Sequence, residues 1–104
     1  MKPTLSPNEL KKLLVSESVT LLDVRRMADY EAEPNLIPGA AWRDPEQVER
    51  WSRELPKERP VVVYCVKGGS VSRSITEALT GKQVNARFLE GGLKAWKEAG
   101  GELE

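Results

Sequence analysis

The sequence contains no histidine, and its only cysteine is Cys65. Without histidine there are no Cys-His or Ser-His catalytic pairs, no imidazole acid/base chemistry and no histidine-ligated metal. A single cysteine excludes an internal disulfide, a Cys-x-x-Cys redox pair and a cysteine zinc cluster. We therefore expect neither a metal nor a cofactor. A nucleophilic Cys65 would have to be activated by backbone dipoles and cations alone.

Long apolar runs are also missing. No run approaches the about 20 residues of a membrane span, and the N-terminus lacks the basic-then-apolar pattern of a signal peptide. Sixteen basic residues balance sixteen acidic ones, which argues against a strongly electrostatic partner such as nucleic acid or a membrane surface. At 104 residues the chain suits one domain that spans residues 1–104. We expect a cytoplasmic monomer.

Segments that predict strands alternate with segments of helical periodicity along the whole chain. Apolar and β-branched runs predict strands at 19–24, 40–42, 61–64 and 86–89. Apolar residues at helical spacing predict a short helical turn at 27–30 and longer helices that follow residues 6, 44, 70 and 92. This alternation is typical of an α/β domain built around a small parallel sheet.

The N-terminal helix has the most complete start signal. Ser6 is placed as the N-cap, Pro7 at the first helical position and Glu9 three residues after the cap, an arrangement that forms a capping box. Leu5 and Leu10 flank the cap at the spacing of a hydrophobic staple. These signals predict that the helix begins at Pro7.

Two opposite charges, Asp23 and Arg25, stand at the end of the apolar strand 19–24. Charges inside a protein are usually paired, because an unpaired buried charge is costly. A structural ion pair is therefore the favoured interpretation, and a role in a functional site is the alternative.

The stretch 60–80 combines a buried strand, a glycine-containing loop and a helix, and Cys65 stands where the strand ends. Backbone N–H groups in the first turn of a helix have no partner inside the helix, and the helix dipole favours negative charge there. Gly68 and Gly69 allow N–H groups of the loop to point inward and form a nest for an anion. The stretch predicts a stabilised thiolate at Cys65.

Three interpretations of the Cys65 loop compete. The first is a buried structural cysteine, because free cysteine is among the most buried residue types. The second is a phosphate site. The loop does not match a Walker A motif, because no lysine stands at the required place. A Cys-x5-Arg phosphatase needs arginine where this chain has Val71, and Arg73 lies two residues too far along.

The third interpretation is sulfur transfer through a persulfide on Cys65. This chemistry needs inward-pointing N–H donors rather than a proton shuttle, so a site without histidine is adequate. Lys67 and Arg73 are candidates to attract an anionic donor such as thiosulfate, and Ser70 is a candidate to donate a hydrogen bond to it. The alternative for these side chains is an ordinary solvated surface position.

Four segments carry a family resemblance. They are Leu-Leu-Asp-Val-Arg at 21–25, Ile-Pro-Gly-Ala at 37–40, Val-Val-Val-Tyr-Cys at 61–65 and Leu-Glu-Gly-Gly-Leu-Lys-Ala-Trp at 89–96. Together they resemble the single-domain rhodaneses, a thiosulfate sulfurtransferase family, along essentially the whole chain. The loop Cys-Val-Lys-Gly-Gly-Ser at 65–70 also resembles the family's loop Cys-Arg-Lys-Gly-Val-Thr, with the lysine, the glycine and a hydroxyl in register.

The resemblance implies a rhodanese-like three-layer α/β domain whose parallel sheet of about five strands is flanked by helices. It implies that Cys65 carries sulfane sulfur as a persulfide within a cradle of the backbone N–H groups of residues 66–70. The resemblance also implies that Asp23 and Arg25 are framework residues near the site, and that the glycines and the tryptophan of segment 89–96 have a structural role.

Two positions depart from the family pattern. Val66 replaces the arginine of Cys-Arg-Lys-Gly-Val-Thr, and this change is expected to lower efficiency with thiosulfate. Leu36 stands where many members have histidine, and this change is expected to affect only the framework.

We expect a sulfurtransferase that takes sulfur from thiosulfate or a related donor and passes it to cyanide or a thiol, with reduced thioredoxin or another protein as a candidate acceptor. Cys65 is the predicted catalytic residue. The predicted substrate-binding residues are Val66, Lys67, Gly68, Gly69, Ser70, Arg73 and Arg25. The alternative is a rhodanese-fold sulfur carrier or protein-interaction module without efficient thiosulfate turnover.

Overall fold

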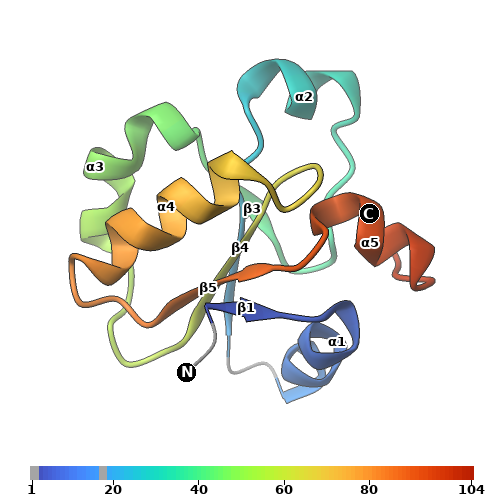
Figure 1. Cartoon of the computed structure of the whole chain (residues 1–104), viewed down its shortest axis with the longest axis horizontal. Helices are drawn as coiled ribbons and strands as arrows, with labels where there is room; N and C mark the ends of the chain where they lie inside the picture. The colour runs from blue at the N-terminus through green and yellow to red at the C-terminus, as the bar shows by residue number, and fades with distance from the viewer. Residues whose placement is uncertain (1–2, 17–18) are drawn as a thin grey trace.

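The computed structural model describes residues 3–16 and 19–104, which form a parallel sheet with helices on both faces (Figure 1). The strands are β1 Thr4–Leu5, β2 Thr20–Asp23, β3 Ala41–Trp42, β4 Val61–Tyr64 and β5 Ala86–Leu89. The helices are α1 Pro7–Ser16, α2 Met27–Ala32, α3 Val48–Trp51, α4 Ser70–Thr80 and α5 Gly92–Glu98, with short 3-10 segments η1 Pro45–Gln47 and η2 Ser52–Glu54. The described strands lie in the order β1-β5-β4-β2-β3, and the predicted α/β architecture is confirmed.

The central strand, β4, sends alternate side chains into two cores. Helices α3 and α4 cover one face of the sheet, and α1 and α5 cover the other (Figure 1). Val61 and Val63 belong to the core under α3 and α4, and Val62 and Tyr64 belong to the core under α1 and α5. All four side chains are at most 1% exposed. An uninterrupted apolar run is the pattern of a strand buried on both faces, so the strand predicted at 61–64 is confirmed.

The predicted start of α1 is confirmed. The Glu9 N–H donates to Ser6 Oγ at 3.1 Å, and the Ser6 N–H donates to Glu9 Oε1 at 2.9 Å, which is the reciprocal arrangement of a capping box. Leu5 and Leu10, on either side of the cap, are fully buried in the same core.

The edge strand β1 is the element that the sequence pattern did not reveal. Thr4 and Leu5 pair in parallel with Phe88 and Leu89 of β5. Two residues are too few to show an alternating pattern, and Leu5 is equally explained by its contact with the cap of α1.

The carboxyl ends of β2 and β4 lie side by side in the middle of the sheet. The chain leaves β2 through α2 toward β3 on one side, and it leaves β4 through α4 toward β5 on the other. Two connections that depart in opposite directions open a crevice between them, where open α/β sheets bind their ligands. Arg25 and Cys65 follow these two strands and therefore stand at this crevice.

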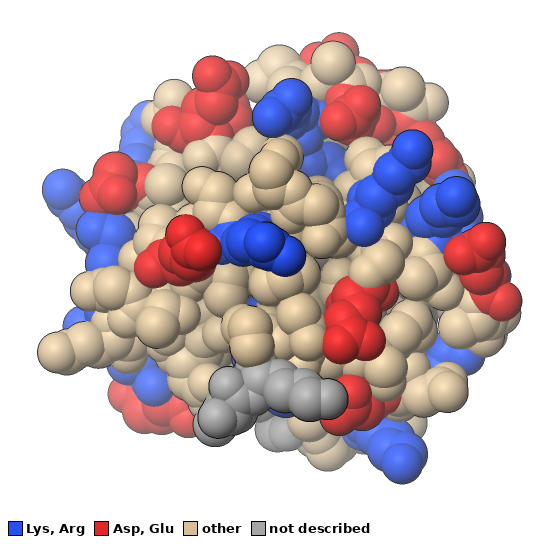
Figure 2. Space-filling view, viewed as in Figure 1, with Lys and Arg blue, Asp and Glu red and all other residues tan. Residues whose placement is uncertain are grey.

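Basic and acidic side chains are interspersed over the face shown in Figure 2. Lys82 forms an ion pair with Glu49 at 2.7 Å, and Lys97 forms one with Glu33. Each lysine holds the pKa of its partner carboxyl below the usual value, chiefly through its hydrogen bond. Over residues 3–16 and 19–104, no helix has the length and apolar character needed to cross a membrane.

Candidate active site

Cys65 follows β4 directly, and it is 6% exposed. A cavity of about 260 Å³ opens over it, and we call this space the Cys65 cavity. Its lining residues come from two segments, 25–29 after β2 and 65–71 after β4. The crevice that the strand order creates is therefore the place where the sole thiol of the chain meets solvent.

Several backbone N–H groups near this cavity have no acceptor among the residues that the structure describes. The first intrahelical bond of α4 runs from the Arg73 N–H to the Gly69 carbonyl at 3.2 Å, so the N–H groups of residues 70–72 have no acceptor inside the helix. Among the described residues, the N–H groups of Val66 and Lys67 have no hydrogen-bond acceptor either. Unpaired donors around a sulfur atom form an environment that stabilises an anion.

The first turn of α5 fixes the direction of the loop donors. The Leu93 N–H donates to the Cys65 carbonyl at 2.8 Å, and the Lys94 N–H donates to the Val66 carbonyl at 3.0 Å. In a trans peptide the carbonyl and the following N–H point in opposite directions, and no cis peptide occurs in the described residues. The N–H groups of Val66 and Lys67 therefore point away from α5.

Two glycines allow α5 to approach the loop this closely. Gly68 has φ of +67°, and a Cβ there would lie 2.7 Å from the Gly91 nitrogen and 2.9 Å from the Leu89 carbonyl oxygen. Gly92 has φ of +59°, and a Cβ there would collide with the Cys65 carbonyl oxygen and the Gly68 nitrogen. Both positions therefore require glycine for its conformation and for its lack of a side chain.

The predicted ion pair between Asp23 and Arg25 is confirmed. Arg25 Nη2 lies 2.6 Å from Asp23 Oδ2, and both residues are at most 1% exposed. The guanidinium also donates to the carbonyl oxygens of Glu33 at 2.8 Å and Asn35 at 3.0 Å. Arg25 lines the Cys65 cavity, but its charge is compensated and its donors hold the segment after α2 in place.

Tyr64, the residue before Cys65, extends this buried network. Its hydroxyl accepts a hydrogen bond from the Ile37 N–H at 3.2 Å. Burial raises the pKa of the Tyr64 phenol above its usual value, and the charge of Asp23 raises it further. The network therefore joins the end of β4 to the loop that precedes β3 and keeps the residue next to the cysteine fixed.

The predicted substrate-binding residues divide into two groups in the structure. Those that line the Cys65 cavity are Val66, Lys67, Gly69, Ser70 and Arg25, whereas Gly68 lies beneath the loop against Gly91. Arg73 is exposed on α4 and does not line the cavity. The structure therefore brings Lys67 and Ser70 to the cysteine, but not Arg73.

Arg26 and Asp29 also line the Cys65 cavity, and the sequence pattern did not single them out. Both follow β2, and a signal was available, because carboxyl ends of neighbouring parallel strands share one edge of a sheet. In the described part of the chain, neither side chain has an ion-pair partner. The uncompensated charges at the cavity are therefore Arg26, Lys67 and the opposing Asp29.

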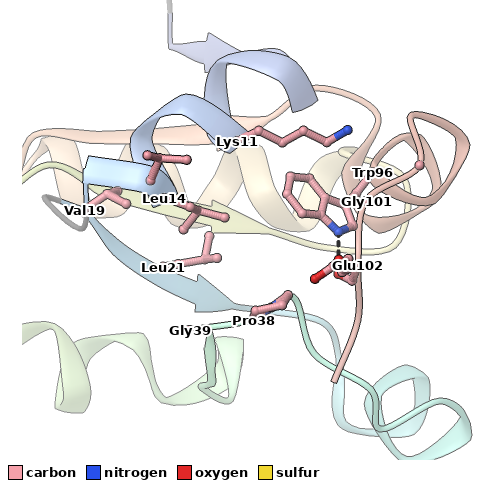
Figure 3. A pocket seen from close by; sticks show the side chains of 11 residues that line it. Lys11, Leu14, Val19, Leu21, Pro38, Gly39, Trp96, Gly101 and Glu102 are labelled. Carbon is pink, nitrogen blue, oxygen red and sulfur yellow. Dashed lines mark hydrogen bonds between the residues drawn. The ribbon is translucent and has the colours of Figure 1, made fainter.

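A separate cavity of about 650 Å³ lies between α1 and the C-terminal segment (Figure 3). Its wall includes Trp96, whose Nε1 donates to the Glu102 carbonyl at 2.8 Å, and the Lys11 Nζ lies 5.8 Å from the Trp96 ring centroid. The rest of the lining is mostly apolar and contains no nucleophile. We therefore take the Cys65 cavity, the smaller of the two, as the candidate active site.

Comparisons with known proteins agree on one family. A family model described as the Rhodanese-like domain matches residues 6–99. The thiosulfate sulfurtransferase GlpE of Coxiella burnetii is 31% identical to this chain over 98 residues, which cover 93% of this chain and 89% of that protein. A sulfurtransferase of Allochromatium vinosum is 29% identical over 90 residues, covering 86% of this chain and 82% of that protein.

A solved structure extends the similarity to three dimensions. The crystal structure of a rhodanese-like domain protein from Staphylococcus aureus matches this fold with a TM-score of 0.80 at 30% identity, covering 100% of this chain and 99% of that one. Sequence and structure therefore agree over nearly the whole length, and the chain belongs to the rhodanese-like domain family of sulfurtransferases.

Proposed function

We propose that the protein is a thiosulfate:cyanide sulfurtransferase in which Cys65 carries the transferred sulfur. The Cys65 thiolate attacks the outer sulfur of thiosulfate, sulfite leaves with the bonding electron pair, and a persulfide remains on the cysteine. Cyanide or a thiolate then attacks the outer sulfur, and Cys65 leaves as the thiolate. Neither step requires a side chain to transfer a proton, which suits a chain without histidine.

The observation that carries this proposal is a set of N–H donors that have no acceptor among the described residues and that follow the only thiol of the chain at one cavity. The donors of residues 70–72 lie at the start of α4, and those of Val66 and Lys67 point away from α5. A persulfide is an anion one atom longer than a thiolate, and such a cradle stabilises it without a compensating side-chain charge. The cavity of about 260 Å³ is small, which suits a compact donor such as thiosulfate.

A phosphatase is not favoured by this cavity. The position that a Cys-x5-Arg enzyme fills with arginine holds Val71, which lines the cavity with an apolar side chain. The nearest following arginine, Arg73, lies outside the cavity. No bidentate clamp for phosphate oxygens is therefore available from this helix.

The mixed charge of the cavity favours one second candidate, a sulfur carrier with poor thiosulfate turnover. Asp29 adds a carboxylate to the lining of the cavity, which is unfavourable for a doubly negative donor, and the charge of Arg25 is already compensated by Asp23. Such a carrier would receive its sulfur from a less highly charged donor, such as a persulfide of another protein, and would retain the same chemistry at Cys65.

Mass spectrometry after incubation with thiosulfate tests the proposal. The wild type is expected to gain the mass of one sulfur atom, whereas Cys65→Ala gains none, and added cyanide should remove the sulfur as thiocyanate. Loading by a small-molecule persulfide but not by thiosulfate would favour the carrier. The absence of an adduct from any sulfane-sulfur donor would exclude both candidates.

A further inference from the structure

Helix α2 borders the Cys65 cavity, but little of its own surface packs against the rest of the protein. Five of its six residues are exposed, and Tyr30 is the one that is half-buried. A helix this short is not stable by itself in water, so its place depends on its contacts with the body of the domain. The contacts of Tyr30 therefore hold the middle of α2.

The Tyr30 ring connects α2 to the ends of two strands. It stacks on the Trp42 ring of β3, with ring centroids 4.9 Å apart and ring planes inclined by 17°. The guanidinium carbon of Arg25, which follows β2, lies over the Tyr30 ring at 5.4 Å from its centroid. Trp42 Nε1 donates to the Arg25 carbonyl at 2.9 Å and links the two partners. Ring stacking and a cation over a ring are directional contacts, so this cluster fixes the rotation of α2 about its axis.

The chain on either side of α2 is held by different contacts. Arg25 lies before the helix, and its guanidinium donates to the carbonyl oxygens of Glu33 and Asn35 beyond the helix. Lys97 of α5 forms an ion pair with Glu33. None of these tethers involves a side chain of α2 itself. They keep the helix in place at its ends, but they leave its orientation to Tyr30.

The orientation of α2 decides which charges face Cys65. Arg26, the N-cap of α2, and Asp29 both line the Cys65 cavity, because residues three apart lie on the same side of a helix. The third uncompensated charge among the described residues at this cavity is Lys67, which belongs to the loop after β4. Glu46 lines the neighbouring cavity together with Arg26, but it belongs to η1. Two of the three charges at Cys65 therefore depend on α2.

We infer that Tyr30 is a positioning residue for the Cys65 cavity, because its contacts with Trp42 and Arg25 orient α2 so that Arg26 and Asp29 face the sulfur. Tyr30 does not line the cavity and acts only through the helix. The consequence for sulfur donors rests on the proposed function, since these two opposite charges then decide how readily an anionic donor approaches Cys65. Loss of the ring leaves the thiol and the N–H donors of its loop in place and changes the charges that face them.

Alkylation of Cys65 measures the charge at the cavity without sulfur transfer. Cys65 is the only thiol of the chain, so each reagent reports on this one site. Iodoacetate is an anion and iodoacetamide is a neutral reagent of similar size, and the ratio of their rates within one variant cancels any change in thiol reactivity. At low salt we expect Asp29→Asn to raise this ratio about threefold and Arg26→Gln to lower it about threefold. Glu31→Gln, on α2 but outside the cavity, should change it little.

Substitutions of Tyr30 then test the positioning role. Tyr30→Phe keeps the ring, so both threefold effects should persist in this background. Tyr30→Leu removes the stack, and each effect should shrink to less than about 1.5-fold, because α2 no longer has a fixed orientation. Circular dichroism and urea unfolding show whether the variant is folded. Trp42→Leu removes the stack from the partner side and provides the same test where Tyr30→Leu does not fold.

The outcomes separate this inference from the proposed function. Full effects of Asp29→Asn and Arg26→Gln in a folded Tyr30→Leu protein would overturn the inference, because α2 would then keep its orientation without the ring. Absence of both effects in the wild-type background would overturn it as well, since α2 would bring no charge to the sulfur. A thiol that reacts with neither reagent would overturn both proposals. The expected ratios in a protein that accepts sulfur from no donor would overturn the proposed function alone.

Discussion

The N–H of Leu93 donates to the carbonyl oxygen of Cys65 at 2.8 Å, so α5 holds the first peptide of the loop that follows Cys65. Because the Cys65 carbonyl points to α5, the N–H of Val66 points to the opposite side, where it can donate a hydrogen bond to an anion. The C-terminal segment 89–96 therefore supports the loop of the candidate site, although it lies far from the cysteine in sequence and lines none of the Cys65 cavity.

Gly92→Ala tests this role of α5. A Cβ at Gly92 would collide with the Cys65 carbonyl oxygen, and its φ of +59° is unfavourable for alanine. We expect the free energy of unfolding to fall by at least about 2 kcal/mol and sulfur loading to be lost even where the variant is folded. Urea unfolding and the mass assay measure the two effects.

Gly81→Ala is the matched control for this substitution. Gly81 ends α4 with φ of −63°, and a Cβ there would meet only ordinary contacts at 3.5 Å. Its stability and loading should remain close to those of the wild type. Full loading of a folded Gly92→Ala variant would show that the close approach of α5 is dispensable.

The buried pair of Asp23 and Arg25 gives a prediction about the framework. Asp23→Asn leaves a buried guanidinium without its counter-ion, and we expect a loss of about 3–5 kcal/mol. The double variant Asp23→Leu, Arg25→Met should lose less than the single variant, because no unpaired charge remains. The exposed pair of Lys82 and Glu49 is the contrast, and Glu49→Gln should have little effect. Equal losses in both Asp23 variants would contradict this account.

Much of this framework could be predicted because its signals are local in sequence. The capping box of α1 lies within four residues, and the ion pair joins two residues, Asp23 and Arg25, that are two apart where β2 ends. The run Val61–Tyr64 identified the central strand because it is apolar at every position. Cys65 was predicted where this strand ends and a glycine loop leads to a helix, and in the structure Cys65 follows β4 directly and α4 begins at Ser70.

The remaining parts of the site depend on strand order, which no local pattern reveals. Arg26 and Asp29 reach the Cys65 cavity only because β2 lies beside β4. Arg73 illustrates a different limit. It lies two residues after Val71, and residues two apart on a helix face different directions, so Val71 lines the cavity and Arg73 does not.

Asp29→Asn is expected to make the protein a better acceptor of sulfur from thiosulfate. Asp29 is the acidic residue among those described at the Cys65 cavity, and it repels a doubly negative donor. We expect the rate of loading at low thiosulfate to rise about threefold to tenfold at low salt, and the gain to shrink at high salt. Glu31→Gln, on the same helix but outside the cavity, should change little. No increase in Asp29→Asn would indicate that the carboxylate does not reach the donor.

Tyr64 gives a prediction for alkaline pH. Burial raises the pKa of its phenol, so the folded state favours the neutral form. The corresponding stability is fully present below the unfolded pKa of about 10 and is lost as pH rises above that value toward the higher folded pKa. Tyr64→Phe should unfold more easily at neutral pH by about 1–3 kcal/mol, because the Ile37 N–H loses its acceptor.

A comparison of the wild type with Tyr64→Phe tests this prediction. Urea titrations at pH 8 to 11 should show the wild type losing stability more steeply than Tyr64→Phe above about pH 10. Parallel curves over this range would mean that the phenol ionises as readily in the folded chain as in the unfolded one.

Ser72 gives a prediction in which protein stability and sulfur loading are measured separately. It is fully buried in the first turn of α4, and its Oγ has no hydrogen-bond partner among the described residues. Burying a hydroxyl without a partner is unfavourable, so Ser72→Ala should leave stability unchanged or raise it by up to about 1 kcal/mol. Thr76→Val is the contrast, because Thr76 Oγ1 donates to the Ser72 carbonyl at 2.8 Å, and its loss should not stabilise the fold. A Ser72→Ala protein that is stable yet loads sulfur poorly would instead show that this hydroxyl turns toward the anion during the reaction.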